Sequence, residues 1–185
     1  MDNRTKEAIR YLGYGRQEAD EQTLGLVADA FRELDETAKP RSIYRTFELQ
    51  WKQTDTIRIE MMEIHSRNLS KNLKGCRQVV LLCGTLGIEV DYLIKRYSYT
   101  EMAKAVVMQA CAAALLEEYL DERQKEIRTE MEKQDLYLRP RFSPGYGDFS
   151  ILHQRAILTL MEASKKIGLT MTESSMLTPT KSVTA

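Results

Sequence analysis

The chain has 185 residues, of which 43% are hydrophobic and 29% are charged, a balance typical of a soluble globular domain with room for a substantial core. Lysine plus arginine and aspartate plus glutamate each number 27, so the net charge is zero. This argues against nucleic acid as the main partner, because phosphate binding usually leaves a basic excess.

Neither a membrane span nor a disulfide framework is indicated. No apolar run reaches the roughly 18 residues that a membrane-spanning helix needs, and the polar N-terminus does not begin a signal peptide. Three cysteines without CxxC spacing predict a reduced, cytoplasmic protein. His65 has no nearby cysteine or second histidine, and spacing defines no catalytic triad. We therefore expect neither a metal site nor catalytic residues.

Two helices are predicted first. Residues 4–12 have an apolar side, and Gly13 and Gly15 end that helix. Asp20 predicts the N-cap of the second helix, whose apolar residues recur at helical spacing as far as Leu34.

Strands are predicted next. Residues 42–51 alternate in their second half, which is typical of a strand. Ile57 and Ile59 alternate with charged residues, which favours a second strand and leaves a helical turn as the alternative. A short helix over 68–73 precedes the apolar run 79–83, which predicts a strand covered on both faces.

A long helix dominates the second half of the sequence. A glycine-punctuated turn over 84–88 leads into a helix over 89–96, but it lacks the spacing of a nucleotide-binding loop. The longest helix is predicted over 101–132, with Thr100 as its cap. Its small residues favour a central position. The charged residues beyond Tyr119 predict that its second half extends into solvent.

Residues 139–149, RPRFSPGYGDF, form a constrained loop. Proline is incompatible with a helix here, and Pro144-Gly145 predicts a type II turn. Such a loop holds backbone amides and arginines in a fixed arrangement that suits an anionic or carboxylate-bearing ligand. A stiff connection between helices is the alternative. A last helix is predicted from Ser150 to Gly168, and the final residues predict the start of a strand.

Three separated segments carry a family resemblance. They are GTLGIE over 84–89 with the end of the long helix, RFSPGY over 141–146, and TESSM over 172–176 with the later Pro179 and Ser182-Val183. In order and spacing they resemble the C-terminal activation domain of cobalamin-dependent methionine synthase, in particular its stand-alone bacterial relatives. The match covers 76–185 and is extended to 1–75 by continuity, so 1–185 is expected to be one such domain.

The resemblance implies a fold and a function. The fold is α+β, a single domain with a curved, mainly antiparallel sheet flanked by helices and one long central helix. The family domain binds S-adenosylmethionine and docks over a cobalamin carried by its partner, a methionine synthase or another corrinoid protein, so that inactive cob(II)alamin is reduced and remethylated. A flavodoxin-like donor supplies the electron. Such a module is an accessory without its own catalytic residues.

The resemblance also assigns site residues, all within the loop. Arg141 matches the arginine that meets the ligand carboxylate. Ser143 falls where the backbone contacts the ligand, and Gly145 allows close approach. Tyr146 covers the ligand or faces the corrin. Phe142 and Pro144 complete the predicted binding segment.

Other family positions differ here. The ligand-binding acid of the long helix aligns with Ala114, which leaves Glu117, one turn on, as its substitute. The aspartate expected near the N-terminus has no clear counterpart, and the tyrosine beyond Ser182-Val183 would lie past Ala185. These differences motivate an alternative: a non-catalytic small-molecule-binding or regulatory protein that kept the fold and lost the methionine synthase role.

Overall fold

The computed structural model describes residues 1–14 and 19–185, so the predicted helix end at Gly15 lies outside the described residues. Over these described residues, helices and strands alternate irregularly, without a repeated βαβ pattern. The helices are α1 (Asn3–Tyr11), α2 (Glu21–Thr37), α3 (Arg67–Asn72), α4 (Ile88–Thr100), α5 (Met102–Glu132), α6 (His153–Met161) and α7 (Ala163–Ile167). The strands are β1 (Arg41–Gln53), β2 (Thr56–Ile59), β3 (Met62–His65), β4 (Gln78–Thr85), β5 (Thr170–Met171), β6 (Leu177–Thr178) and β7 (Ser182–Thr184).

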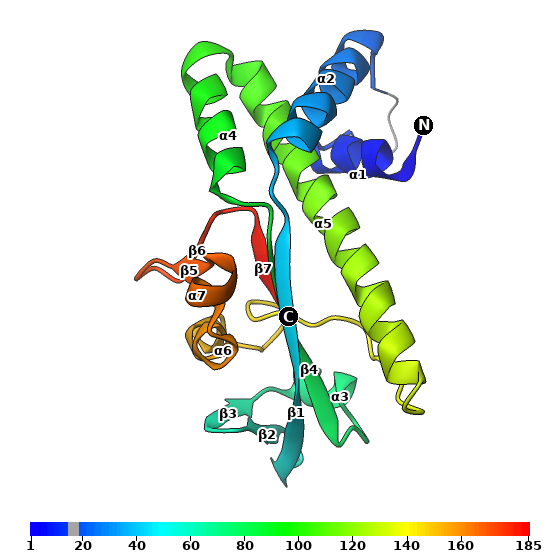
Figure 1. The fold of residues 1–185 in the computed structure, drawn as a ribbon, viewed down its shortest axis with the longest axis vertical. Helices are drawn as coiled ribbons and strands as arrows, with labels where there is room; N and C mark the ends of the chain where they lie inside the picture. Colours follow the sequence, from blue (N-terminus) through cyan, green and yellow to red (C-terminus); the bar gives the residue numbers. More distant parts are fainter. Residues whose placement is uncertain (15–18) are drawn as a thin grey trace.

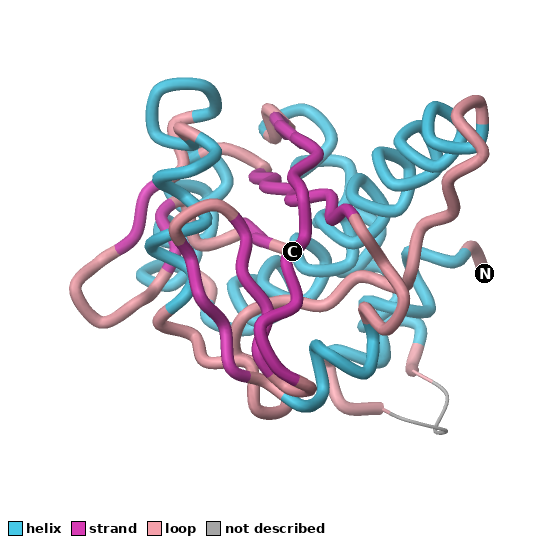
Figure 2. Tube along the Cα trace, turned by 90° about the horizontal axis from the view of Figure 1, so that it is seen from below, coloured by secondary structure: helices cyan, strands magenta, loops and turns pink. Residues whose placement is uncertain are grey.

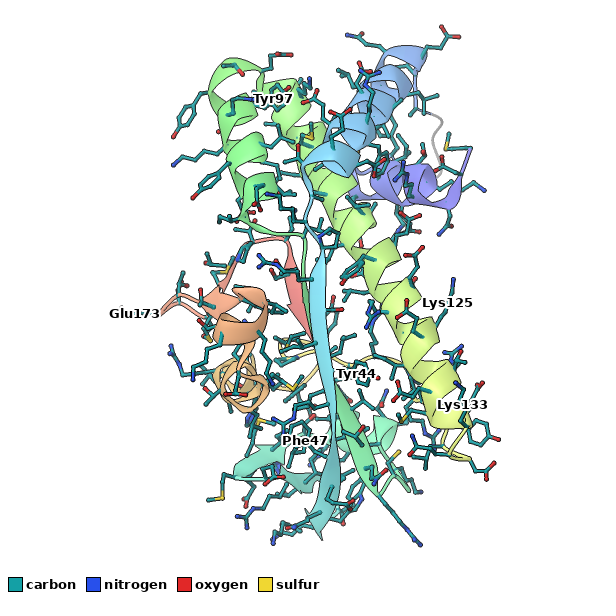
Figure 3. All side chains as sticks on the ribbon, viewed as in Figure 1. Tyr44, Phe47, Tyr97, Lys125, Lys133 and Glu173 are labelled. Atoms are coloured by element: carbon teal, nitrogen blue, oxygen red, sulfur yellow. The ribbon has the colours of Figure 1, made fainter. Side chains whose placement is uncertain are left out.

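The main sheet has the order β3-β2-β1-β4-β7, and every neighbouring pair is antiparallel. β1 pairs with β4 from Arg41↔Thr85 to Glu48↔Gln78 and continues into its pairing with β2. β5 and β6 form a separate antiparallel hairpin, and Glu173 lies in the turn between them at the edge of the molecule (Figure 3). The predicted α+β class, with a curled antiparallel sheet and one long helix, is confirmed.

Helices cover both faces of this sheet. In Figure 1, α5 runs beside the sheet for most of the molecule's length, whereas α6 and α7 lie on the other side of β1. Figure 2 shows the strands with helices on either side. Because successive residues of a strand face opposite sides, Leu82 packs in the core beneath α5, and Leu81 and Cys83 pack in the core beneath α6 and α7.

α5 approaches the sheet closely at a glycine. A Cβ on Gly84 would lie 2.7 Å from Cδ2 of the fully buried Leu120, so the missing side chain lets the helix approach the strand. Gly84 therefore has a packing role in the glycine-punctuated turn.

The expectation that the second half of α5 extends into solvent is wrong for one side of that helix. Ile127 and Met131 are buried among the residues of the core beneath α5, and Tyr44 of β1 (Figure 3) donates a hydrogen bond to Glu130. These contacts hold the charged half of α5 over the sheet.

Of three predicted helix starts, one is confirmed and two differ. Asp20 caps α2 as predicted, accepting from the Thr23 N–H at 2.7 Å. Thr100 does not cap α5, because Glu101 occupies the N-cap position without a capping side-chain bond. The helix predicted from Ser150 starts instead at His153 and is divided into α6 and α7 by Glu162, whose φ is +52°.

Two further observations concern the described helices and the cysteines. None of these helices combines the length and hydropathy that a bilayer span requires. Cys76, Cys83 and Cys111 are all free thiols. Burial raises the pKa values of Cys83 and Cys111 to about 12, so neither is a nucleophile at neutral pH.

Candidate functional site

The loop after α5 contains the predicted turn. The N–H of Tyr146 donates to the carbonyl of Ser143 at 3.2 Å, and Gly145 has a φ of +96°. The positive φ at the third position, after Pro144 at the second, is the geometry of a type II turn. A further bond from the Gly145 N–H to the Phe149 carbonyl at 2.7 Å closes the loop on itself. The backbone here is fixed by local bonds.

A carboxylate attaches this loop to the start of α3. Asp148 accepts from the Ser66 hydroxyl at 2.5 Å, from the Arg67 N–H at 2.8 Å and from the Asn68 N–H at 3.1 Å. These bonds lower the pKa of Asp148, because each one favours the charged carboxylate. Asp148 thus satisfies N–H groups that the first turn of a helix leaves without partners.

Arg141 lies in a cluster of acceptors from one side of α5. Its Nη2 donates to Oε2 of Glu117 at 3.0 Å, and its Nη1 lies 2.8 Å from Oδ1 of Asp121 and donates to Oε1 of Gln124 at 2.8 Å. Positions 117, 121 and 124 share one face of the helix because they are separated by four and three residues. The Arg141 side chain keeps 23% of its accessible surface, Glu117 keeps 45% and Asp121 keeps 62%. A cation and two carboxylates therefore meet at an accessible surface.

Two exposed aromatic rings belong to the same region. Tyr146 is 68% exposed and Tyr11, at the end of α1, is 45% exposed. Partial burial raises the pKa of Tyr11, and the charge of Glu117 and the nearby Tyr146 hydroxyl contribute in the same direction. α1, the loop and α5 thus all contribute side chains around Glu117.

The structure separates the predicted site residues into two groups. Arg141 and Glu117 are brought together by their ion pair, and Tyr146 is an exposed ring of the same loop as Arg141. Ser143 is half-buried, and within the described chain its N–H has no partner. By contrast, Phe142 and Pro144 are placed as packing residues.

Packing accounts for those two residues. The Phe142 ring lies against the core beneath α6 and α7, with its centroid 6.3 Å from that of Phe149. Pro144 is buried in the turn. Neither side chain presents a polar group to a ligand, so both shape the loop that carries Arg141 and Ser143.

Three residues in or beside the Arg141 cluster, namely Asp121, Gln124 and Tyr11, were not predicted from the sequence. Asp121 and Gln124 carry a recognisable signal, because they follow Glu117 at helical spacing on one face. Tyr11 carries none, since its place near Glu117 depends on how α1 packs on α5. Ala114, the position aligned with the family acid, is 2% exposed in the core and supplies no charge.

Over residues 1–14 and 19–185, no group of three or more His, Cys, Asp or Glu side chains is arranged to hold a metal ion. The cluster is suited to ionic recognition. Its guanidinium fits a carboxylate, and its carboxylates and aromatic rings fit a cation.

Comparison with known proteins identifies the fold. No family model matches the chain, and no curated protein matches it in sequence. Among solved structures, the chain is similar to the crystal structure of the MetH reactivation domain bound to AdoHcy, with a TM-score of 0.69 and 18% identity. The superposition covers 97% of this chain and 73% of that chain. The chain therefore has the fold of that reactivation domain, and the similarity extends well beyond residues 76–185.

Proposed function

We propose that this chain, which has the fold of the MetH reactivation domain, binds S-adenosylmethionine at the Arg141 cluster and assists reactivation of a corrinoid protein. The observation that carries the proposal is the pairing of Arg141 with Glu117 and Asp121 on this fold. The amino acid part of S-adenosylmethionine carries a carboxylate and an ammonium group. A guanidinium beside carboxylates offers a partner of opposite charge to each of them.

In this proposal each group of the site has its own role. Arg141 gives up its contact with Asp121 and makes a bidentate contact with the ligand carboxylate. The Ser143 N–H donates to the same carboxylate. Glu117 and Asp121 accept from the ammonium. Gly145, with its φ of +96° and no β-carbon, lets the ligand approach the loop backbone.

The positive sulfonium of S-adenosylmethionine has partners as well. Glu117 and Asp121 attract a cation, and the exposed ring of Tyr146 offers a face to which a desolvated cation is attracted. One face of the Tyr11 ring is already covered by Arg10, whose guanidinium lies 4.9 Å from the ring centroid. The neutral thioether of S-adenosylhomocysteine gains neither interaction. The site is therefore expected to favour S-adenosylmethionine over S-adenosylhomocysteine.

The resemblance and the fold support a wider role. We propose that the chain acts in trans on a methionine synthase or another corrinoid protein whose cobalamin has been oxidised to cob(II)alamin. A flavodoxin-like donor supplies the electron, S-adenosylmethionine supplies the methyl group, and this chain positions the ligand. Three free thiols are consistent with the cytoplasm.

A reactivation assay tests this role. A methionine synthase lacking its own reactivation domain is prepared as cob(II)alamin and mixed with reduced flavodoxin, S-adenosylmethionine and this protein. The absorbance spectrum of the corrinoid is expected to change to that of methylcobalamin only when this protein is present. A spectrum that stays that of cob(II)alamin at every protein ratio would contradict the proposed role.

One observation favours the second candidate, a small-molecule-binding protein that lost the methionine synthase role. The three acceptors already occupy Arg141, so a carboxylate ligand must compete with Asp121 and Gln124. A pull-down with the corrinoid protein separates the two candidates. Stable association that requires S-adenosylmethionine supports reactivation, whereas ligand binding without association supports the second candidate.

A further inference from the structure

Lys181, just before β7, is a cation without an ion pair. The residue is half-buried, and its Nζ donates to the carbonyl of Gln109 in α5 at 3.1 Å. None of the ion pairs among the described residues includes it. An ammonium group carries three N–H donors, so Lys181 has donors left for a ligand. Lys181 is not one of the residues of the Arg141 cluster.

Burial leaves this ammonium short of charged partners. Desolvation lowers the pKa of Lys181, and the charge of Asp91 opposes that shift only in part, because burial disfavours the charged form. Both oxygens of Asp91 already accept from Thr180, one from its N–H at 2.8 Å and the other from its hydroxyl at 2.6 Å. An acceptor on a ligand would therefore meet a partly desolvated donor, and such a bond is stronger there than in water.

Lys181 approaches α5 from the side opposite to β1. In the main sheet β4 lies between β1 and β7, and Leu120 of α5 packs over Gly84 of β4. On the β1 side, Tyr119 of α5 donates to the hydroxyl of Ser42 at 2.9 Å. β7 occupies the other side of β4, so Lys181 contacts α5 on the side away from β1.

Glu117, the acid that pairs with the loop arginine, lies on that same side. An α-helix turns by about 100° per residue, so Glu117 is displaced from Leu120 by about 60° in one direction and Tyr119 by about 100° in the other. Glu117 therefore faces away from β1, as Lys181 does. Gln109, which Lys181 contacts, lies eight positions before Glu117, and this spacing corresponds to about 12 Å along the helix axis.

A small residue lies between these two positions of α5. Ala113 is half-buried and stands four positions from both Gln109 and Glu117, so the three share one side of the helix. Its short side chain leaves no long group on α5 between the Arg141 cluster and Lys181. S-Adenosylmethionine, held at one end by its carboxylate and ammonium, can therefore place its nucleoside over Ala113 and within reach of Lys181.

We propose that Lys181 is a further ligand-contact residue, which donates a hydrogen bond to the nucleoside of S-adenosylmethionine at the end of the site opposite to Arg141. This role rests on the proposed binding of S-adenosylmethionine at the Arg141 cluster. The ring nitrogens of adenine and the ribose hydroxyls are acceptors, and a charged donor makes a stronger bond to them than a neutral donor does. Recognition is thus divided, because Arg141 and Glu117 bind the amino acid part and Lys181 binds the nucleoside.

Two partial ligands test this division by calorimetry of the 185-residue protein. 5′-Methylthioadenosine has the nucleoside without the amino acid part, whereas S-methyl-L-methionine has the amino acid part and the sulfonium without the nucleoside. Lys181→Met keeps the length of the side chain and removes its donors. It is expected to weaken S-adenosylmethionine and 5′-methylthioadenosine alike, by about tenfold or more, and to leave S-methyl-L-methionine unchanged. Arg141→Ala is expected to weaken S-methyl-L-methionine and to leave 5′-methylthioadenosine unchanged.

The outcomes separate this role from the proposed function. Unchanged affinities for S-adenosylmethionine and 5′-methylthioadenosine in Lys181→Met, with S-methyl-L-methionine still dependent on Arg141, would overturn the role of Lys181 and leave the proposed function standing. Equal losses for all three ligands in Lys181→Met would mean that Lys181 acts through the fold, which also contradicts its role as a ligand contact. A wild-type protein that binds none of the three ligands would contradict both.

Amine labelling of the wild-type protein tests the same contact without a substitution. Acetic anhydride is expected to acetylate Lys181 several-fold more slowly when 5′-methylthioadenosine is saturating, because the bound nucleoside covers the ammonium. Lys125, an exposed residue of α5 (Figure 3), is the control and is expected to be acetylated at an unchanged rate. S-Methyl-L-methionine is expected to protect neither lysine. Equal acetylation of Lys181 with and without 5′-methylthioadenosine would refute the contact.

Discussion

The guanidinium of Arg141 lies 3.0 Å from the carboxylate of Glu117, although the two residues are 24 positions apart in the chain. One comes from a proline-constrained loop and the other from the middle of α5. Asp148 accepts a hydrogen bond from the start of α3 and so holds the loop there. Leu120, about one turn after Glu117 in α5, packs against Gly84 of β4. The pair is therefore held by two structural elements that position it independently of a ligand.

Arg141→Ala is expected to weaken S-adenosylmethionine binding by about 1.5–3 kcal/mol, because a charge-assisted bond to the ligand carboxylate is lost. This corresponds to an increase in Kd of roughly 10-fold to 150-fold. The matched control is Arg139→Ala, since Arg139 contacts the Lys74 carbonyl and faces no proposed ligand group. Calorimetry of both variants measures the effect. Equal losses in the two variants would contradict the assignment of Arg141.

Glu117→Gln is expected to weaken S-adenosylmethionine by about 1–2 kcal/mol, because the ammonium and sulfonium lose a nearby carboxylate. 5′-Methylthioadenosine lacks both positive charges and is the control ligand. Its affinity is expected to be unchanged in Glu117→Gln and in Arg141→Ala. If the substitution weakened both ligands equally, Glu117 would have a structural role and not a binding role.

The attachment of the loop at Asp148 predicts a dependence of stability on pH. The three bonds lower the pKa of Asp148 in the folded protein from its ordinary value of 3.8. A lowered pKa stabilises the folded state above the unfolded value, and this contribution is lost as pH falls through the folded pKa. The denaturant midpoint of Asp148→Asn is therefore expected to be lower than that of the wild type at pH 7. The difference should shrink at pH values below about 3.8, and a constant difference would contradict the ionic origin.

Two glycines are expected to respond oppositely to alanine. Gly84→Ala places a Cβ 2.7 Å from the buried Leu120 and is expected to destabilise the protein by about 1–3 kcal/mol through overpacking. Gly25 lies in α2 with nothing within 4 Å of the added atom, so Gly25→Ala is expected to stabilise by about 0.5–1 kcal/mol. Urea unfolding measures both. A neutral Gly84→Ala would mean that α5 can shift away from the sheet.

Local signals in the sequence account for much of the fold. The N-cap Asp20, the proline-glycine turn at 144–145 and the apolar run 79–83 each fix local geometry through residue chemistry, and each prediction is confirmed. Boundaries without such a signal were wrong. Glu162 adopts a φ of +52° and Glu60 a φ of +51°, and no glycine or asparagine marks either turn, so the helix break and β3 were missed.

The candidate site was only partly predictable for a related reason. The loop has an unusual composition, and the family resemblance singled out Arg141 within it. The partners of Arg141 depend on tertiary packing. In the sequence, Asp121 and Gln124 look like part of a solvated charged face. The burial of Ile127 and Met131 shows that this half of α5 packs against the sheet.

Titration calorimetry with S-adenosylmethionine tests the central claim most directly. The wild-type protein at neutral pH is expected to bind one equivalent, more tightly than it binds S-adenosylhomocysteine, and Arg141→Ala is expected to lose most of that affinity while Arg139→Ala keeps it. The absence of a binding signal at millimolar S-adenosylmethionine, or an unchanged affinity in Arg141→Ala, would contradict the account.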